Sequence, residues 1–515
     1  MEEVNKPMLL KKTEDFFAEM EKTVEERKNE IRNAKDHIEV EGQSYYISNA
    51  GDDNLDGKTP DTAWQTLNKV SNAELQPGDV VFLRRGDTFR GQIVAKPGVT
   101  YAAYGVGSKP NIYGWDKNMA VAECWELVDE KHHIWKCTDK VLDSGTIVFN
   151  DGEQHSRKLI PSYINGQFVC RDNPRKSFVI EEEMSQDLDI FFCFTERMTT
   201  RESKGESFPV PEVGDQCYGD LYLRCDAGNP GACFDSIELL PHRHLIKVGK
   251  CNDVHIDNLC LKYGGGHGIA AVSSVNGLHV TNCEIGWIGG CIQNYLGLDP
   301  NYPQGTRGTV TRYGNGVEIY GACDDYEVSN CYIYQVYDAG MTHQITARNK
   351  VVEMKNILYK DNLVEYCVYS IEYFLEKEIE NESYMSDIEI CGNILRFSGY
   401  GWGQQRHNVD TPAHIKGWSY VNTARNFTIH HNVFDRAAYR MLHLVAREIE
   451  SLPILYENIY IQKSGGAIGQ YGENLIKEPG IVLCDKKAEE IIRGQWGDID
   501  AKVLYMNPEK RDKES

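Results

Sequence analysis

The chain has 515 residues and a net charge of −22, with an isoelectric point near 5.2. This acidity argues against nucleic acid and anionic membranes as partners, and mildly against a polyanionic substrate. No stretch reaches the roughly 18 consecutive apolar residues of a membrane span. The 46 glycines and 29 tyrosines, against 17 prolines, favour many short strands and turns over long helices.

The cysteines and the N-terminus indicate the compartment. The 16 cysteines contain no CxxC pair and no Cys/His spacing typical of zinc, so we expect neither a metal nor another cofactor. The N-terminal residues lack an apolar core of signal-peptide length. We therefore predict a cytoplasmic protein with reduced cysteines; a secreted protein whose signal has been removed is the alternative. Cys260, Cys283 and Cys331 recur in similar patterns, which predicts small apolar side chains stacked inside a repeat.

The N-terminal region changes character near residue 43. Residues 1–42 mix charges at i,i+4 spacing with apolar residues near one face, which predicts a helical arm or cap. Residues 43–114 then alternate short strands with Gly/Pro turns. The segments Tyr45-Tyr46-Ile47-Ser48, Gly51 to Gly57, Pro77-Gly78-Asp79 and Tyr104-Gly105 resemble the start of right-handed parallel β-helix enzymes, among them many glycoside hydrolases and polysaccharide lyases. This resemblance implies the architecture and a carbohydrate substrate.

Residues 115–245 are predicted as a β-rich insertion or irregular coils that line one side of a cleft. From residue 246 to 472 a repeat becomes explicit. Seven segments share an alternating strand, among them NDVHIDNLCL, NGLHVTNCEI and DYEVSNCYIY. The first six continue to a turn asparagine and a second apolar strand. These asparagines are Asn258, Asn282, Asn330, Asn362, Asn393 and Asn432.

The asparagine spacings are 24, 48, 32, 31 and 39 residues, so a coil of about 22–24 residues carries loop insertions of different length. Asparagine tolerates left-handed backbone geometry, and its amide can bond to the next coil. One coil cannot bury its own apolar face, whereas a stack of coils buries a continuous core. We therefore predict an all-β chain, a right-handed parallel β-helix, with residues 473–515 as a C-terminal cap or tail. The largest insertion within the repeat is expected at 293–313.

A second short strand follows each asparagine strand, as in GVEIY, GMTHQ and YSIEY; GWGQQRH is assigned to the next coil. Because alternate side chains of a strand point to opposite faces, the apolar residues of these strands predict that Glu318, Thr342 and Glu372 face outward. Glu318 and Glu372 lie two coils apart, about 10 Å along the stack. Asp338 occupies the turn between them.

Acidic residues on adjacent coils suit glycosidic cleavage. Carboxyl groups about 5–5.5 Å apart retain anomeric configuration, and a separation of about 6.5–9.5 Å inverts it. We predict Asp338 and Glu372 as the acid and the base or nucleophile, with Glu318 as alternate or helper. The candidate substrate-binding residues are His343, Gln344, Thr342, Trp402, Gln404, Arg406, His443 and Tyr373. Strict alternation turns His343 inward, which argues against its inclusion.

The leading prediction is a glycoside hydrolase that cleaves a glycosidic bond in an oligosaccharide or glycan fragment. A polysaccharide lyase or uronate epimerase on the same fold is the second prediction; such chemistry usually needs a Lys or Arg base, for which Arg406 and Arg440 are the main candidates within the repeat. A carbohydrate-binding solenoid without catalysis is the third. Oligomeric state, sugar and linkage do not follow from the sequence.

Overall fold

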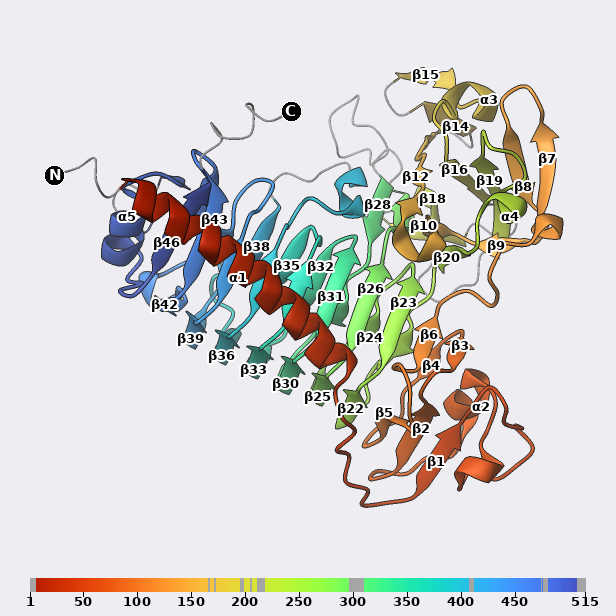
Figure 1. The fold of residues 1–515 in the computed structure, drawn as a ribbon, viewed down its shortest axis with the longest axis horizontal. Coiled ribbons are helices and arrows are strands. Elements are labelled where there is room, and N and C mark those ends of the chain that lie inside the picture. The colour runs from red at the N-terminus through yellow and green to blue at the C-terminus, as the bar shows by residue number, and fades with distance from the viewer. Residues whose placement is uncertain are drawn as a thin grey trace.

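A computed structural model of the chain describes residues 6–164, 167–170, 173–194, 199–203, 206–210, 218–295, 310–406, 412–473, 475 and 480–506. Three ten-stranded sheets run side by side along the molecule, and successive strands of the chain pass from one sheet to the next (Figure 1). Within each sheet the pairing is parallel, apart from one antiparallel pair at the C-terminal end, β44 (Ala467–Tyr471) with β45 (Val482–Leu483). The chain is therefore the predicted right-handed parallel β-helix.

Each coil contributes one strand to each sheet, and we number the sheets 1 to 3. Sheet 1 contains β1 (Ser44–Ile47), β2 (Val80–Arg84), β5 (Thr100–Tyr104), β22 (Val254–Asp257), β25 (Val275–Thr281), β30 (Cys323–Ser329), β33 (Glu353–Lys360), β36 (Tyr384–Cys391), β39 (Ala424–His430) and β42 (Ile454–Tyr456). Sheet 2 contains β4 (Ile93–Val94), β21 (Ile246–Lys247), β24 (Ile269–Ala271), β29 (Val317–Ile319), β32 (Ala339–Ala347), β35 (Tyr369–Lys377), β38 (Ala413–Gly417), β41 (Leu442–Leu444), β44 (Ala467–Tyr471) and β45 (Val482–Leu483). Sheet 3 contains β3 (Thr88–Arg90), β6 (Asn111–Tyr113), β23 (Cys260–Gly264), β26 (Glu284–Ile288), β31 (Tyr332–Val336), β34 (Leu363–Glu365), β37 (Ile394–Arg396), β40 (Val433–Asp435), β43 (Ile459–Lys463) and β46 (Lys502–Met506).

The core lies between the three sheets, where equivalent residues of successive coils stack. One such stack runs along sheet 1 through Val254, Leu278, Tyr326, Ile357 and Ile388, all almost completely buried. Such stacking gives each coil the apolar partner that it lacks alone.

The cysteine prediction holds for two of its three residues. Cys283 and Cys331 follow their asparagines directly and lie in the main core. Cys260 follows Asn258 by two residues and aligns with Glu284, so its side chain belongs to the other face of sheet 3 and the stacking prediction is wrong for it. The described cysteines are all free.

The turn asparagines form two structurally different groups. Asn258, Asn282 and Asn330 adopt left-handed backbone angles, as expected for turn asparagines. Asn330 Nδ2 also donates to Asn282 Oδ1 at 2.5 Å. The later members form a continuous ladder, in which the Asn362 amide donates to Asn393 Oδ1 at 3.0 Å and the Asn393 amide donates to Asn432 Oδ1 at 2.9 Å. These bonds satisfy buried backbone and side-chain groups in every coil of this part of the stack.

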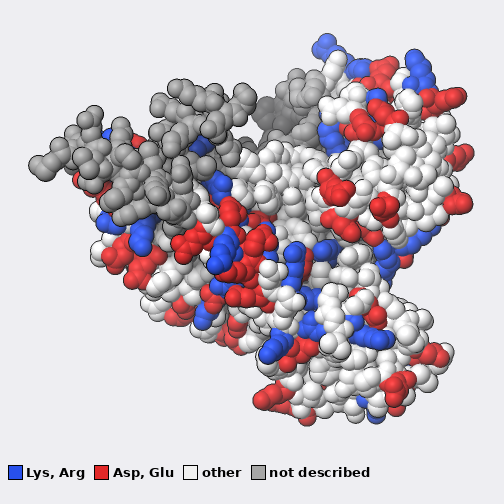
Figure 2. Space-filling view, in the orientation of Figure 1, with Lys and Arg blue, Asp and Glu red and all other residues white. Residues whose placement is uncertain are grey.

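The long helix α1 (Lys6–Arg32) lies across sheet 3 (Figure 1). Met20, Val24 and Ile31 pack against apolar side chains of that sheet, and Arg32 forms a salt bridge with Glu284 at 3.0 Å. Residues 33–42 are not helical, so the arm is shorter than the predicted 1–42. In Figure 2, acidic and basic side chains are intermixed over this face.

A separate β-rich unit is inserted between β6 and β21, at one side of the stack (Figure 1). Its core is distinct from the core of the coils. The main elements of the insertion are β7 (Trp125–Asp129), β8 (Ile134–Cys137), β9 (Val141–Leu142), β10 (Ser144–Phe149), β11 (Gln154–His155), β12 (Arg157–Lys158), β13 (Ser162–Ile164), β14 (Gln167–Cys170), β15 (Asn173–Ser177), α3 (Ile180–Glu183), β16 (Asp189–Phe194), β17 (Thr199–Ser203), β18 (Glu206–Val210), β19 (Tyr218–Arg224), α4 (Pro230–Cys233) and β20 (Ile237–Pro241).

The remaining elements are short connections and the C-terminal helix. They are α2 (Leu67–Asn72), β27 (Cys291–Tyr295), β28 (Val310–Tyr313), α5 (Ala488–Gln495) and the 3₁₀ turns Pro60–Thr62, Ala122–Cys124, Asn150–Gly152, Trp402–Gln405 and Ile449–Ser451. β27 and β28 pair at the base of the predicted 293–313 insertion, most of which lies outside the described residues. Among the described residues, no helix combines the length and the apolar character needed to cross a membrane.

Candidate active site

A row of polar side chains runs along the outer face of sheet 2. The pairing of Val317 with Met341 places Glu318 beside Thr342. From Thr342 onward, each residue of the row pairs directly with the next residue. The row reads Glu318, Thr342, Glu372, Lys416, His443 and Gln470. The prediction that the two glutamates lie on the same face two coils apart is therefore confirmed.

Glu318 is held by three side-chain donors. Asn315 Nδ2 and Thr342 Oγ1 donate to Glu318 Oε2 at 2.6 and 2.5 Å, and Gln344 Nε2 lies 3.0 and 3.1 Å from the two carboxylate oxygens. Burial raises the pKa of Glu318, while these hydrogen bonds act in the opposite direction. The contacts fix the carboxyl group and use the donors of Thr342 and Gln344.

Asp338 lies between β31 and β32 and forms an ion pair with Arg406. Its backbone carbonyl accepts the amide N–H groups of Val368 and Tyr369 at 3.0 and 3.1 Å, so the turn is fixed to the next coil. Burial raises the pKa of Asp338, and the Arg406 guanidinium opposes this rise. Asp338 is therefore a buried carboxyl group whose charged form has one cationic partner.

Glu372 is the carboxyl group with the largest shift at this site. Its pKa rises from 4.5 to about 8, because burial and the nearby charges of Asp338 and Glu318 disfavour its ionisation. Arg406 and the Trp418 indole act in the opposite direction and lower this pKa. Asp338 and Glu318 thus both act on the ionisation of Glu372. At neutral pH Glu372 is a protonated acid beside Asp338.

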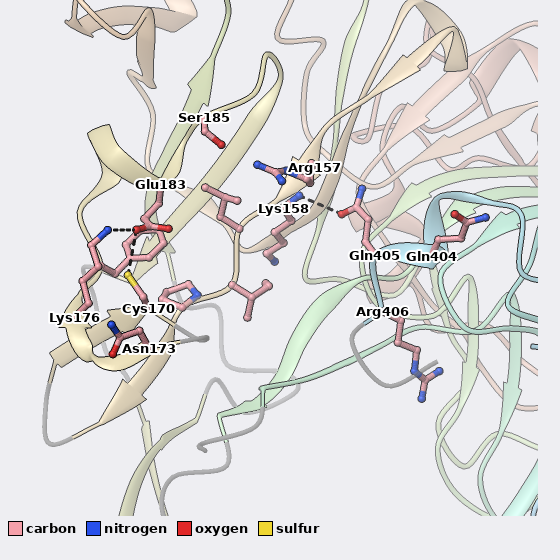
Figure 3. A pocket seen from close by; sticks show the side chains of 14 residues that line it. Arg157, Lys158, Cys170, Asn173, Lys176, Glu183, Ser185, Gln404, Gln405 and Arg406 are labelled. Atoms are coloured by element: carbon pink, nitrogen blue, oxygen red, sulfur yellow. Dashed lines mark hydrogen bonds and ion pairs between the residues drawn. The ribbon is translucent and has the colours of Figure 1, made fainter. Parts of the chain in front are cut away.

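A cavity of about 640 Å³ lies against Arg406, and the described residues of its wall do not include Glu318, Asp338 or Glu372. It lies between the insertion and the 3₁₀ turn Trp402–Gln405, and Gln404, Gln405 and Arg406 contribute to its wall (Figure 3). Gln405 Oε1 accepts the backbone N–H of Lys158 at 3.1 Å, so the turn is tied to the insertion. Arg406 lines this cavity and also pairs with Asp338. One arginine therefore contacts both the cavity and a carboxyl group of the site.

Two of the predicted substrate-binding residues lie in the interior. His343 is completely buried, contacts the Tyr359 hydroxyl at 3.0 Å and stacks on Tyr373, which is also in the core. Burial lowers the pKa of His343 to about 3, so the imidazole is neutral. Strand alternation turns both side chains inward, and neither can reach a bound sugar in this arrangement.

The assignment of GWGQQRH to a strand of sheet 2 is wrong. Trp402–Gln405 is a 3₁₀ turn in a long loop, and the strand of this coil is β38, where Ala413 pairs with Tyr369. Trp402 is buried against Tyr337, and its indole N–H donates to Gln335 O at 2.8 Å, so it packs between elements and offers no free face for a sugar.

The error in this coil hid Lys416 and Trp418. Lys416 occupies the row position next to Glu372, and its ammonium lies 4.0 Å from the centre of the Trp418 ring. Lys416 Nζ also lies 2.7 Å from His443 Nδ1, which places the predicted His443 at the same site. The alternation in AHIKG, with Ile415 inside, is the sequence signal that locates Lys416.

One group of described residues has the donor atoms of a metal site: Glu389, Cys391 and His430, within 4.8 Å of one another. It lies on sheet 1, apart from the carboxyl groups of sheet 2. His430 Nε2 lies 3.0 Å from Glu389 Oε1, and burial raises the pKa of the Cys391 thiol to about 12, which disfavours the thiolate that binds metals. We assign no metal to it.

Three parallel sheets around one core, with a polar row on sheet 2, define the molecule as a parallel β-helix. No protein-family model matches the chain, and the search of curated proteins gave no match. Solved structures with similarity include XylC in complex with xylose, at 11% identity over 91% of this chain and 85% of that chain, with a TM-score of 0.40. The GH136 lacto-N-biosidase from Eubacterium ramulus is 12% identical over 90% of this chain and 68% of that chain, with a TM-score of 0.34.

The family 28 exopolygalacturonase from Yersinia enterocolitica is 12% identical over 84% of this chain and 69% of that chain, again with a TM-score of 0.34. These identities and TM-scores are too low for a substrate or a catalytic residue to be transferred to this chain. The assignment of function therefore depends on the geometry of its own residues.

Proposed function

We propose that the protein is a glycoside hydrolase that cleaves a glycosidic bond in an oligosaccharide or glycan fragment. The observation that carries this proposal is the set of three buried carboxyl groups, in which burial raises the pKa of Glu372 to about 8 and Asp338 pairs with the Arg406 guanidinium. Glycosidic cleavage needs this combination of a neutral acid and a carboxylate.

In this proposal Glu372 is the general acid. Its proton is transferred to the glycosidic oxygen as the bond to the anomeric carbon breaks, and the leaving sugar departs as an alcohol. Asp338, paired with Arg406, would act as its carboxylate in one of two ways. It attacks the anomeric carbon, and water then hydrolyses the resulting glycosyl ester and frees the sugar, or it removes a proton from the water that attacks the anomeric carbon. Glu318 serves as a positioning residue, because its oxygens are occupied by Asn315, Thr342 and Gln344.

The test is sugar release from a panel of oligosaccharides by the wild type and by Asp338→Asn. Loss of a positioned acid or base lowers kcat by about 10²- to 10⁴-fold, and the matched control is Asp325→Asn, an exposed aspartate on sheet 1. Full activity in Asp338→Asn would remove this residue from the mechanism. The anomer formed first, read by NMR, decides whether Asp338 is the nucleophile (retention) or the base (inversion).

A lyase is the second candidate, favoured by Lys416 beside Glu372. A lyase removes the proton next to a uronate carboxyl group and leaves an unsaturated sugar. An ultraviolet-absorbing product from a uronate polymer would establish it in place of hydrolysis, and binding without turnover across the whole panel would favour a non-catalytic solenoid.

A further inference from the structure

Arg440 lies just before β41, one coil beyond the strand that carries Lys416. Its backbone N–H donates to Pro412 O at 3.4 Å, and its side chain is only 6% exposed. The guanidinium donates through Nη1 to Gln470 Oε1, the last member of the polar row on sheet 2. The charged end of Arg440 therefore lies along the row that also contains Glu372.

The hydrogen-bonding capacity of Arg440 is only partly used. Its Nε is buried without a partner, and among the described residues no carboxylate forms an ion pair with it. The charge of Glu473 acts on Arg440. The Glu473 carboxylate itself accepts the Tyr420 hydroxyl at 2.7 Å and lies 3.9 Å from His443 Nε2. A buried cation with a neutral partner is unfavourable, because desolvation is not compensated by an opposite charge.

Lys416 adds a second positive charge at this place, and His443 lies beside it. Lys416 is only 2% exposed, and burial together with the Lys416 and Arg440 charges lowers the pKa of His443 to about 3. His443 is thus neutral, and its Nδ1 accepts from the Lys416 ammonium. Two buried cations consequently share one end of the row, while the carboxyl groups occupy the other.

We propose that Arg440 and Lys416 bind a negatively charged substituent of the substrate, a carboxylate or a sulfate ester, so that the enzyme acts on an acidic oligosaccharide. This inference rests on the proposed hydrolase function. The spacing between neighbouring coils is about 4.8 Å, so a group bound to Lys416 belongs to the sugar at Glu372 or to its neighbour. An arginine fork is well suited to the two oxygens of such a group. The net charge of −22 describes the whole surface and does not exclude a local cationic subsite.

The experiment compares an oligosaccharide that contains a uronic acid with the same oligosaccharide after reduction of its carboxyl group, and with a sulfated counterpart. The measured quantity is the ratio of kcat/KM for the acidic and neutral members. Arg440→Gln should lower this ratio by about 10- to 100-fold, the value of one charge-assisted hydrogen bond. The control is Arg447→Gln, an arginine that is 42% exposed and donates to Ile379 O. If this ratio falls more for the uronate, the bound anion is a carboxylate. If it falls more for the sulfated oligosaccharide, the bound anion is a sulfate ester.

Arg440→Lys retains the charge and should keep part of the preference, and Lys416→Met repeats the test if Arg440→Gln does not fold. An unchanged ratio in both charge-removing variants, or a wild type that prefers the neutral sugar, would overturn the inference while leaving the hydrolase proposal intact. Calorimetric binding separates the two proposals. Acidic oligosaccharide that binds to the wild type without being cleaved, and loses affinity in Arg440→Gln, refutes hydrolysis but supports the subsite.

Discussion

Replacing Glu372 by glutamine should inactivate the enzyme and stabilise the fold. The amide has the shape of the protonated acid but cannot ionise. In the folded protein the pKa of Glu372 lies at about 8 instead of 4.5, so the folded state binds one more proton than the unfolded state between these values. The contribution of Glu372 to stability is therefore largest below pH 4.5 and falls as pH rises toward 8.

The size of the effect follows from this shift. Each pH unit between the two values lowers the free energy of unfolding by about 1.4 kcal/mol, which gives about 3 kcal/mol at pH 7 and about 5 kcal/mol above pH 8. Because glutamine does not titrate, Glu372→Gln should match the wild type near pH 4 and exceed its stability at pH 9 by a few kcal/mol.

The assay is urea unfolding of both proteins at a series of pH values, with sugar release measured in parallel. The control is Glu376→Gln, which removes an exposed glutamate of the same strand, outside the buried row. A Glu372→Gln protein that is less stable than the wild type at every pH would refute the reasoning, because it would mean that Glu372 is ionised in the folded state. Stabilisation with full activity would instead remove Glu372 from the mechanism.

Three further measurements follow from the structure. Activity should fall above pH 8 with the loss of the Glu372 proton, and a kcat/KM profile that still rises there would contradict its role as acid. Trp402→Ala should lower the free energy of unfolding by about 3–5 kcal/mol, since this indole is buried against Tyr337; a loss of sugar affinity at unchanged stability would argue for a binding role. Asn393→Ala should cost about 1–3 kcal/mol in urea unfolding, because it leaves the amide groups of the adjacent coils unpaired. A smaller cost than for Asn381→Ala, at a half-buried position in a loop, would show that the ladder is dispensable.

The architecture could be predicted from the sequence because its signals are local. Alternating strands repeat along the stack, six of them are followed by a turn asparagine, and alternation alone decided that Glu318 and Glu372 point outward on one sheet. The same rule turned His343 inward, which the fold confirms. These features depend on the backbone geometry of a few neighbouring residues, so no tertiary information was needed.

The composition of the site was decided by the tertiary structure, because loop length determines which segment continues the stack. Glycine-rich GWGQQRH was assigned to the strand of its coil, yet it forms a turn in a loop, and β38 begins only at Ala413. The loop carries Arg406 back to Asp338, and the late start of β38 places Lys416 beside Glu372. The raised pKa of Glu372 has the same origin, since it arises from burial and from charges that only the stacking of coils brings together.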